Sequence, residues 1–113
     1  MSHPRRGEVW TIDLGTGRGS EQKGLRPVLI VQNDVGNLHA ATTIVAAITS
    51  TVKSYPFTVP LRRGQGGLDR PSMVNLAQVF TVAKERLRKR LGMLPGEQMV
   101  RVNRALRISL GLD

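Results

Sequence analysis

A guanidinium and a run of hydroxyls stand at the ends of two apolar segments. Arg26 directly precedes the apolar segment 27–31, and Thr49 with residues 50–51 follows the apolar segment 43–48. If the two segments are antiparallel neighbours in a sheet, the start of one lies beside the end of the other. The sequence therefore predicts that Arg26 and Thr49 share one rim. The alternative is that Arg26 is a solvated strand-entry residue and Thr49 a turn residue.

Such a pair could act on RNA without a metal ion. RNA carries its own nucleophile, the 2′-hydroxyl, so a protein need only orient it, move protons and stabilise the charge that develops on phosphorus. A guanidinium binds phosphate oxygens well, and a hydroxyl can donate a hydrogen bond to one. These residue types are therefore compatible with attack of the ribose on its own phosphodiester.

The composition excludes several other kinds of site. The 113 residues include no cysteine, which rules out a disulfide framework, a thiolate zinc site and a cysteine nucleophile. His3 and His39 have no ligand partner at metal spacing. The glycine-rich stretch 15–20 lacks the endings of dinucleotide and phosphate-binding loops. We therefore expect no metal and no cofactor.

The charge favours a polyanionic partner. Lys and Arg number 17 against 8 Asp and Glu, which gives a formal charge of +9. Such a field raises the encounter rate with RNA, DNA, an acidic protein or an anionic membrane surface. A well-solvated surface that serves only solubility is the simpler alternative. Because no segment approaches the ~18 apolar residues of a membrane span and no signal peptide is evident, we expect a cytoplasmic protein without membrane contact.

Hydrophobic periodicity predicts a single, mainly β domain over residues 1–113. We expect strands over 8–14, 27–31, 43–48, 57–61, 72–82 (as one or two strands) and 87–94, with a turn at 33–37 and one helical turn at 84–86. Pro56 and Pro60 make 57–61 an edge strand. A final helix after Pro95, with Gly111 as its stop, has a stripe formed by Met99, Val102, Leu106 and Leu110. Closely spaced strands with one helix indicate a small antiparallel barrel or sandwich.

One motif is specific. The run Gly-Ser-Glu-Gln-Lys-Gly-Leu-Arg-Pro at 19–27 resembles the signature of the MazF/PemK (Kid) toxin family. Further matching pieces follow the family's order along nearly the whole chain, at residues 7–10, 48–50, 55–59, 66–71, 78–79 and 91–94.

The resemblance implies an SH3-like barrel that works as a homodimer. Members of the family are ribosome-independent endoribonucleases that cut single-stranded RNA at short sequences without metal. Their products carry a 2′,3′-cyclic phosphate and a 5′-hydroxyl. A MazE-like antitoxin blocks the RNA groove with an acidic, flexible C-terminal segment.

The resemblance also implies roles for individual residues. The family's catalytic arginine and threonine fall on Arg26 and Thr49. We interpret Arg26 as the cation that clamps the scissile phosphate and protonates the leaving oxygen, because a guanidinium does not deprotonate near neutral pH and is a poor base. We interpret Thr49 as a hydrogen-bond partner of a non-bridging oxygen.

Five further residues are candidates for contact with the RNA. Ser20 and Gln78 match positions that line the RNA groove, and Glu21 matches a loop glutamate that orients the arginine or influences proton transfer. Thr51 belongs to the polar run after Ile48. Asp69 matches an aspartate with a catalytic role in Kid-type members. Those members have an arginine two residues earlier, where this chain has Gly67, so we interpret Asp69 as a groove residue and not as a base.

Simpler interpretations stay open for some residues. Glu21 could merely pair with a neighbouring cation at the surface, and Gln78 could be a satisfied amide within the barrel. Trp10 alternates with Ile12 and is expected in the core rather than under a base.

Two other functions remain open for the whole protein. A barrel of this kind could block a protein target, as the related CcdB toxins block DNA gyrase. It could also be a basic RNA-binding protein without catalysis.

Overall fold

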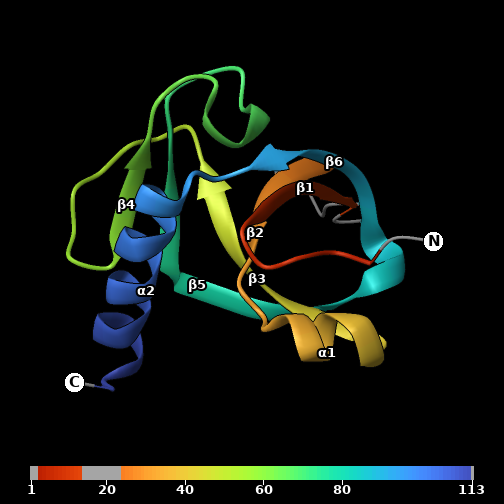
Figure 1. Ribbon diagram of the computed structural model, residues 1–113. Coiled ribbons are helices and arrows are strands. Elements are labelled where there is room, and N and C mark those ends of the chain that lie inside the picture. The colour runs from red at the N-terminus through yellow and green to blue at the C-terminus, as the bar shows by residue number, and fades with distance from the viewer. Residues whose placement is uncertain (1–2, 14–23, 113) are drawn as a thin grey trace, which may run out of the picture.

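One strongly curved antiparallel sheet forms most of the molecule (Figure 1). The computed structural model describes residues 3–13 and 24–112. The strands are β1 (Glu8–Asp13), β2 (Leu25–Ile30), β3 (Thr42–Thr49), β4 (Thr58–Leu61), β5 (Ser72–Ala83) and β6 (Leu87–Met93). The helices are α1 (Asp34–His39) and α2 (Gly96–Leu110), with single 3₁₀ turns η1 (Gln65–Gly67) and η2 (Lys84–Arg86).

The strand order β4-β5-β3-β2-β1-β6 confirms the mainly β prediction with a C-terminal helix. All neighbouring strands pair antiparallel. The sheet is not closed by hydrogen bonds between β4 and β6; instead η1, in the loop after β4, lies against β6. The architecture is therefore that of a barrel with one seam.

The strand β2 is buried on both faces, as its unbroken apolar run predicts. Val28 and Ile30 pack into one core cluster, and Leu29 packs into another on the opposite face. The alternation follows from the two-residue period of a strand. The half-buried Trp10 packs against the cluster of Val28, which confirms its expected place in the core.

The strand β5 is one long strand with a sharp irregularity. Its register against β3 shifts between the pairs Ala46↔Val79 and Ala47↔Asn75, so residues 76–78 have no partner on β3. Such a bulge bends a strand and increases its twist. The bend lets the first part of β5 pair with β4 and the last part continue along β3.

The seam of the barrel is held where the backbone of η1 crosses that of β6 at Gly66, Gly67 and Gly92, a contact that we call the glycine crossing. Gly67 in η1 has φ 76° and lies against β6, where an added Cβ would meet the carbonyl oxygen of Leu91 at 2.0 Å. A Cβ at Gly92 would meet the backbone of Gly66 at 2.7 Å. Only residues without side chains allow the two backbones to come this close. The loop after β4 is thereby fixed on β6.

The edge strand β4 confirms the prediction from its prolines. The carbonyl of Pro60 accepts a hydrogen bond at 3.2 Å from Nε2 of Gln98 on α2, so this residue faces away from β5. A proline can stand there because no ladder donor is lost. The helix also covers the exposed edge, which limits pairing with other chains.

The final helix ends where the sequence predicts. Gly111 adopts the left-handed conformation at φ 67°, and its N–H bonds the carbonyls of Arg107 and Ile108. The predicted stripe is wrong at its end, because Leu110 is 59% exposed. The buried face instead runs through Val102 and Ala105, since the last turn extends past the sheet (Figure 1).

The short helix α1, with Asn33 as its N-cap, replaces the turn predicted at 33–37. The side chain of Asn33 accepts a hydrogen bond at 2.8 Å from the N–H of Gly36 and so caps α1. Asparagine is favoured both in turns and at helix N-caps, so the local pattern could not distinguish them.

Candidate active site

The pairing of β2 with β3 brings Arg26 and Thr49 together. The ladder ends at Val28↔Ala47; Arg26 lies two residues before this pair on β2, and Thr49 two residues after it on β3. Both residues line one groove of about 290 Å³. The groove is formed by Leu25, Arg26, Pro27, Ile48, Thr49, Ser50, Leu68, Asp69, Arg70 and Ser72. The predicted shared rim is confirmed.

The guanidinium of Arg26 is available to a ligand. Its side chain is half-buried at the start of β2, where its neighbour on β1 is Ile12. Among residues 3–13 and 24–112, no carboxylate forms an ion pair with it. Within this part of the chain, its charge is left to act on whatever enters the groove.

The hydroxyl of Thr49 is oriented by its own loop. Its Oγ1 accepts a hydrogen bond at 3.2 Å from the backbone N–H of Thr51. A hydroxyl has one proton to donate besides its acceptor positions. With the N–H of Thr51 fixed on the oxygen, the proton of Thr49 is free to turn toward the groove.

One wall of the groove, the loop before β5, carries a pair of charged side chains. Asp69 Oδ1 accepts from Nε of Arg70 at 3.2 Å, and both side chains are mostly exposed. The backbone of this wall is fixed, because Ser72 Oγ donates to the carbonyl of Arg70 at 3.0 Å. The sequence pattern singled out Asp69 alone and not Arg70 next to it, although Arg70 lies within the matching stretch 66–71.

Not all predicted residues lie on the groove. Thr51 is exposed and touches Thr49 only through its backbone N–H. Gln78 is exposed within the unpaired segment of β5 and is not among the residues that line the groove. Ser20 and Glu21 lie outside the described residues.

The structure explains why no arginine precedes Asp69 by two residues. That position is Gly67, where an added Cβ would meet the backbone of β6. A guanidinium at this point of the loop has no room. The cation on this wall is Arg70 instead.

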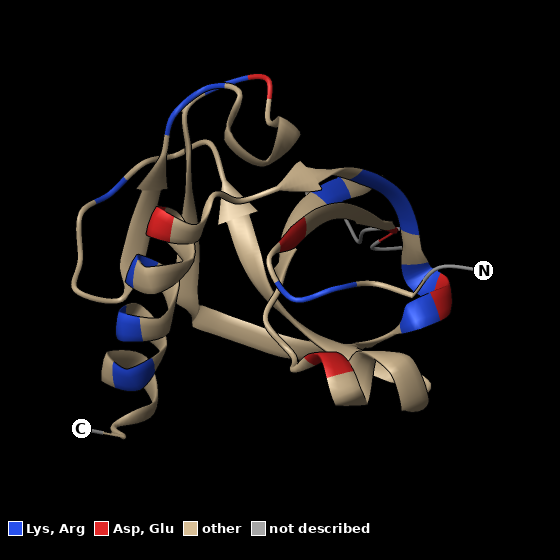
Figure 2. Ribbon diagram, in the orientation of Figure 1, with Lys and Arg blue, Asp and Glu red and all other residues tan. Residues whose placement is uncertain are grey.

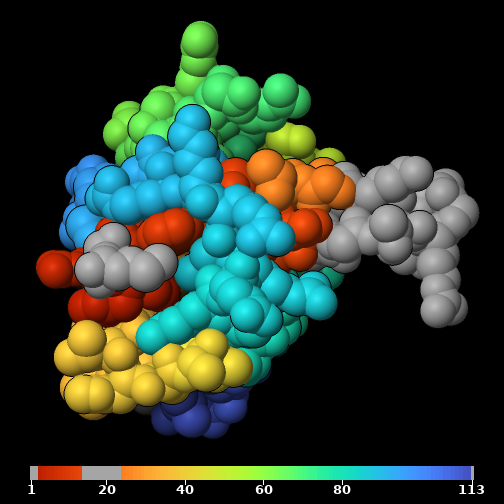
Figure 3. Space-filling view, turned by 90° about the vertical axis from the view of Figure 1, so that its right-hand side faces the viewer, coloured from red at the N-terminus to blue at the C-terminus, as the bar shows by residue number. Residues whose placement is uncertain are grey.

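The basic residues gather on two sides of the molecule. Lys and Arg lie along η2 and β6 on one side and along α2 on the other (Figure 2). The start of β2 (orange in Figure 3) reaches the surface beside the loop that precedes β5 (green), on the face that also carries η2 and β6. A polyanion that enters the groove therefore meets the positive charge of this face.

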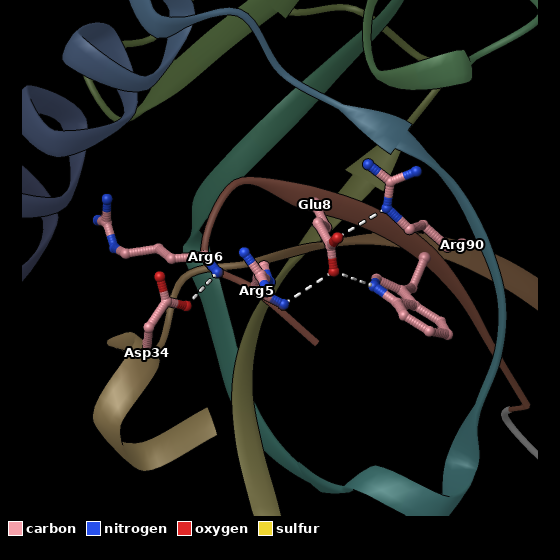
Figure 4. Close-up of polar contacts among 6 residues, drawn as sticks. Arg5, Arg6, Glu8, Asp34 and Arg90 are labelled. Atoms are coloured by element: carbon pink, nitrogen blue, oxygen red, sulfur yellow. Dashed lines mark hydrogen bonds and ion pairs between the residues drawn. The ribbon is translucent and has the colours of Figure 1, made fainter. Parts of the chain in front are cut away.

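A buried carboxylate orders part of this basic surface (Figure 4). Glu8 accepts hydrogen bonds from Arg5 N at 2.8 Å, Trp10 Nε1 at 3.0 Å and Arg90 Nε at 2.7 Å. Burial on its own would raise the pKa of Glu8, but these three donors outweigh it and hold the pKa below its ordinary value. Arg90 is thereby fixed on β6.

A larger hollow of about 420 Å³ lies between β4 and α2. It contains none of the predicted site residues, so its size does not make it the site of the chemistry. Within the described ranges, no three His, Asp or Glu residues are grouped as a metal ion would require. No helix of the described chain is long and apolar enough to span a membrane.

Fold and groove together define a class: a small basic β-barrel in which the guanidinium of Arg26 and the hydroxyl of Thr49 line one groove. Residues 5–110 match the family model of the PemK-like, MazF-like toxins of type II toxin-antitoxin systems. The chain belongs to this family.

Individual relatives agree. An endoribonuclease MazF of Staphylococcus saprophyticus is 44% identical over 110 residues, which is 96% of this chain and 92% of that protein. One from Staphylococcus epidermidis is 44% identical over 111 residues, with the same coverage. Among solved structures, a mycobacterial endoribonuclease in complex with its cognate antitoxin superposes with a TM-score of 0.84 at 32% identity, covering 97% of each chain.

These comparisons decide between the hypotheses left open by the sequence. The predicted family and its SH3-like fold are confirmed, and at the level of the family so is the endoribonuclease hypothesis. Nothing among these relatives supports the alternative of a gyrase inhibitor of the CcdB type.

Proposed function

We propose that this protein is the toxin of a type II toxin-antitoxin pair and cuts single-stranded RNA by transesterification. The observation that carries the proposal is the meeting of Arg26 and Thr49 in one groove, at the ends of adjacent strands. The names of relatives that share 44% of the sequence support it.

The reaction needs no water or cofactor in its first step. The ribose 2′-oxygen loses its proton and forms a bond to the adjacent phosphorus, while the bond from phosphorus to the 5′-oxygen breaks. The 5′-oxygen gains a proton. The products are a 2′,3′-cyclic phosphate and a 5′-hydroxyl, and protons balance because one leaves the nucleophile and one joins the leaving group.

Arg26 and Thr49 stabilise the charge that builds up on phosphorus. The two N–H groups of the Arg26 fork bind two oxygens at once, and the same side chain donates toward the leaving 5′-oxygen. Thr49 donates its free O–H to a non-bridging oxygen. Because these donors are placed before the reaction, each contributes more in the transition state than water would.

The remaining candidates contact the RNA around this centre. Asp69 lines the same groove as Thr49. Thr51 acts through the hydroxyl that its N–H orients. Ser20 and Glu21 extend the contacts from the part of the sequence before β2, and Gln78 extends them from the bend of β5.

The protein acts in the cytoplasm as a homodimer of single-domain subunits, and a MazE-like antitoxin with an acidic segment inhibits it. The net charge of +9 favours such a partner. A mycobacterial structural neighbour is solved with its own antitoxin, which supports this part of the proposal.

The test uses purified protein, a long RNA and EDTA. We expect cleavage to persist in the chelator, and to stop at a mapped site when the nucleotide 5′ to the break is 2′-deoxy. Arg26→Ala should lower the cleavage rate at least ~10²-fold while RNA binding changes much less. Arg63→Ala, which removes the same charge away from the groove, should cleave like the wild type.

Two results would overturn the proposal. Cleavage of the deoxy-substituted strand at the normal rate would exclude attack by the 2′-oxygen. Wild-type turnover in Arg26→Ala would remove the guanidinium from the mechanism.

A further inference from the structure

Asp69 and Arg70 form a donor–acceptor pair that lines the same groove as Arg26 and Thr49. Oδ1 of Asp69 binds Nε of Arg70 at 3.2 Å. In the part of the chain that the structure describes, neither side chain has another hydrogen-bond partner. The second carboxylate oxygen and the terminal N–H groups of the guanidinium are therefore open to a ligand.

The backbone beneath the pair is fixed at both ends. On one side, Gly67 lies directly on β6 and Leu68 is buried at 7% exposure. On the other side, Ser72 is 4% exposed and its hydroxyl holds the carbonyl of Arg70 at 3.0 Å. A short loop held in this way loses little entropy when it binds, which suits recognition more than a freely moving loop would.

The charges of the pair argue against a phosphate as its ligand. The positive charge of Arg70 is offset by the carboxylate of Asp69 at hydrogen-bond distance, and that carboxylate would repel a phosphate. A base carries no net charge and presents donors and acceptors side by side. Single-stranded RNA exposes these edges, and proteins that select RNA sequences bind them.

The number of open groups matches one base in particular. The terminal guanidinium nitrogens offer two N–H groups side by side, and the carboxylate offers one free oxygen. Cytosine has two adjacent acceptors, O2 and N3, followed by one donor, the N4 amino group. On their Watson–Crick edges, guanine has one acceptor and two donors, uracil alternates between acceptors and a donor, and adenine offers only one of each.

We propose that the Asp69–Arg70 pair reads a cytosine next to the scissile phosphate, with Arg70 donating to O2 and N3 and Asp69 accepting from N4. This inference rests on the proposed RNA cleavage and adds its sequence preference. Asp69 and Arg70 are specificity residues of the groove, whereas Arg26 and Thr49 act on the phosphate.

The experiment measures kcat/KM on short RNAs that differ in one base. After the cleavage sites are mapped, each position within two nucleotides of the break is varied among the four bases. At one of these positions we expect cytosine to be favoured about tenfold or more over uracil, the size of one good bidentate contact. Arg70→Ala and Asp69→Asn should reduce this preference to about threefold or less, while cleavage of the uracil RNA persists.

A base analogue tests the individual contact. In 2-pyrimidinone the N4 amino group of cytosine is missing, but O2 and N3 remain. The wild type should lose activity on this analogue, whereas Asp69→Asn should treat cytosine and the analogue alike. Arg63→Ala is the matched control, because it removes an exposed arginine of the same loop that does not line the groove, and it should keep the full cytosine preference.

Several outcomes would overturn the inference. One is a wild-type enzyme without cytosine preference at any tested position. Another is an equal loss on all four bases in Arg70→Ala, which would indicate a phosphate contact or a structural role; a thermal melt of the variant separates the two. The proposed function fails on different observations, since the 2′-deoxy strand and Arg26→Ala test the chemistry whatever the base.

Discussion

At the scale of single residues, the hydroxyl of Thr49 has two functions: its oxygen accepts one hydrogen bond, and its proton can be donated in another. Thr49 accepts the N–H of Thr51 and has its own proton left to donate. The geometry therefore assigns the methyl group no role in the chemistry. A side chain that keeps the hydroxyl should keep the function, and one that keeps only the shape should not.

Thr49→Val should lower kcat about 10²-fold, by the effect of removing one transition-state donor, with KM little changed. Thr49→Ser should stay within a few-fold of the wild type. The measurement is steady-state cleavage of a short RNA with one mapped site. Equal activity of the valine and serine variants would contradict the role given to the hydroxyl.

The residue pattern could predict that Arg26 and Thr49 lie close together, because in an antiparallel pair the start of one strand lies beside the end of the other. This rule needs only the two strands themselves. Arg70 reaches the groove only because Gly67 packs on β6, which is a contact between distant parts of the chain. Gln78 was placed on the groove by resemblance, but a bulge whose position depends on packing sets it in the bend of β5. Such long-range effects leave no periodic signal in the sequence.

At the scale of elements, the glycine crossing decides whether the barrel can close. Gly67 and Gly64 both have positive φ, 76° and 94°, but only Gly67 lies against another backbone. An added Cβ at Gly64 would meet nothing within 4 Å. The two positions therefore separate the cost of backbone conformation from the cost of the clash.

Gly64→Ala should destabilise the protein by about 1–2 kcal/mol, the cost of a left-handed conformation for a residue with a Cβ. Gly67→Ala should cost about 1–3 kcal/mol more, because the loop must move off β6. Urea denaturation of both variants measures the difference. Equal losses would show that the seam tolerates a side chain.

The Glu8 cluster ties β1 to β6 and depends on pH. Because the pKa of Glu8 is lower in the folded state than its ordinary value near 4.5, its contribution to stability is complete above that value. The contribution is lost as pH falls through the lowered folded pKa. The carboxylate of Asp34, whose pKa is lowered by the backbone N–H of Arg6 and the side chain of Asn37, acts in the same direction.

Glu8→Gln should therefore be less stable than the wild type at pH 7, and the gap should narrow as the pH is lowered below about 4.5. The free energy of unfolding at several pH values checks this. Glu97→Gln gives the background, since this exposed carboxylate lies on α2 and away from β6. A gap that stays constant with pH would show that Glu8 contributes by packing rather than by its charge.

At the scale of the whole molecule, the net charge could be predicted from composition and the positions of the strands from periodicity. The six strands, the edge position of β4 and the basic face of β6 all agree with their patterns. The pattern could not predict that β5 is one continuous strand or that α1 is a helix, because each depends on how distant elements pack. Turn-forming residues in particular serve helix caps equally well.

The net charge of +9 should make RNA binding strongly dependent on salt. For a single strand, the logarithm of the binding constant falls with a slope of about 0.7 per phosphate contact against the logarithm of salt concentration. Titration of a 2′-deoxy-blocked oligonucleotide at several salt concentrations measures this slope. A flat response would contradict binding led by phosphates.

The alternation of strand faces has a consequence for how the molecule comes apart. β1, β2, β3 and β5 each supply residues to both core clusters, as Val9 and Ile12 of β1 do. Neither cluster can melt while the other stays intact, since the same four strands form both. Heat should therefore unfold the chain in a single step, with equal calorimetric and van't Hoff enthalpies.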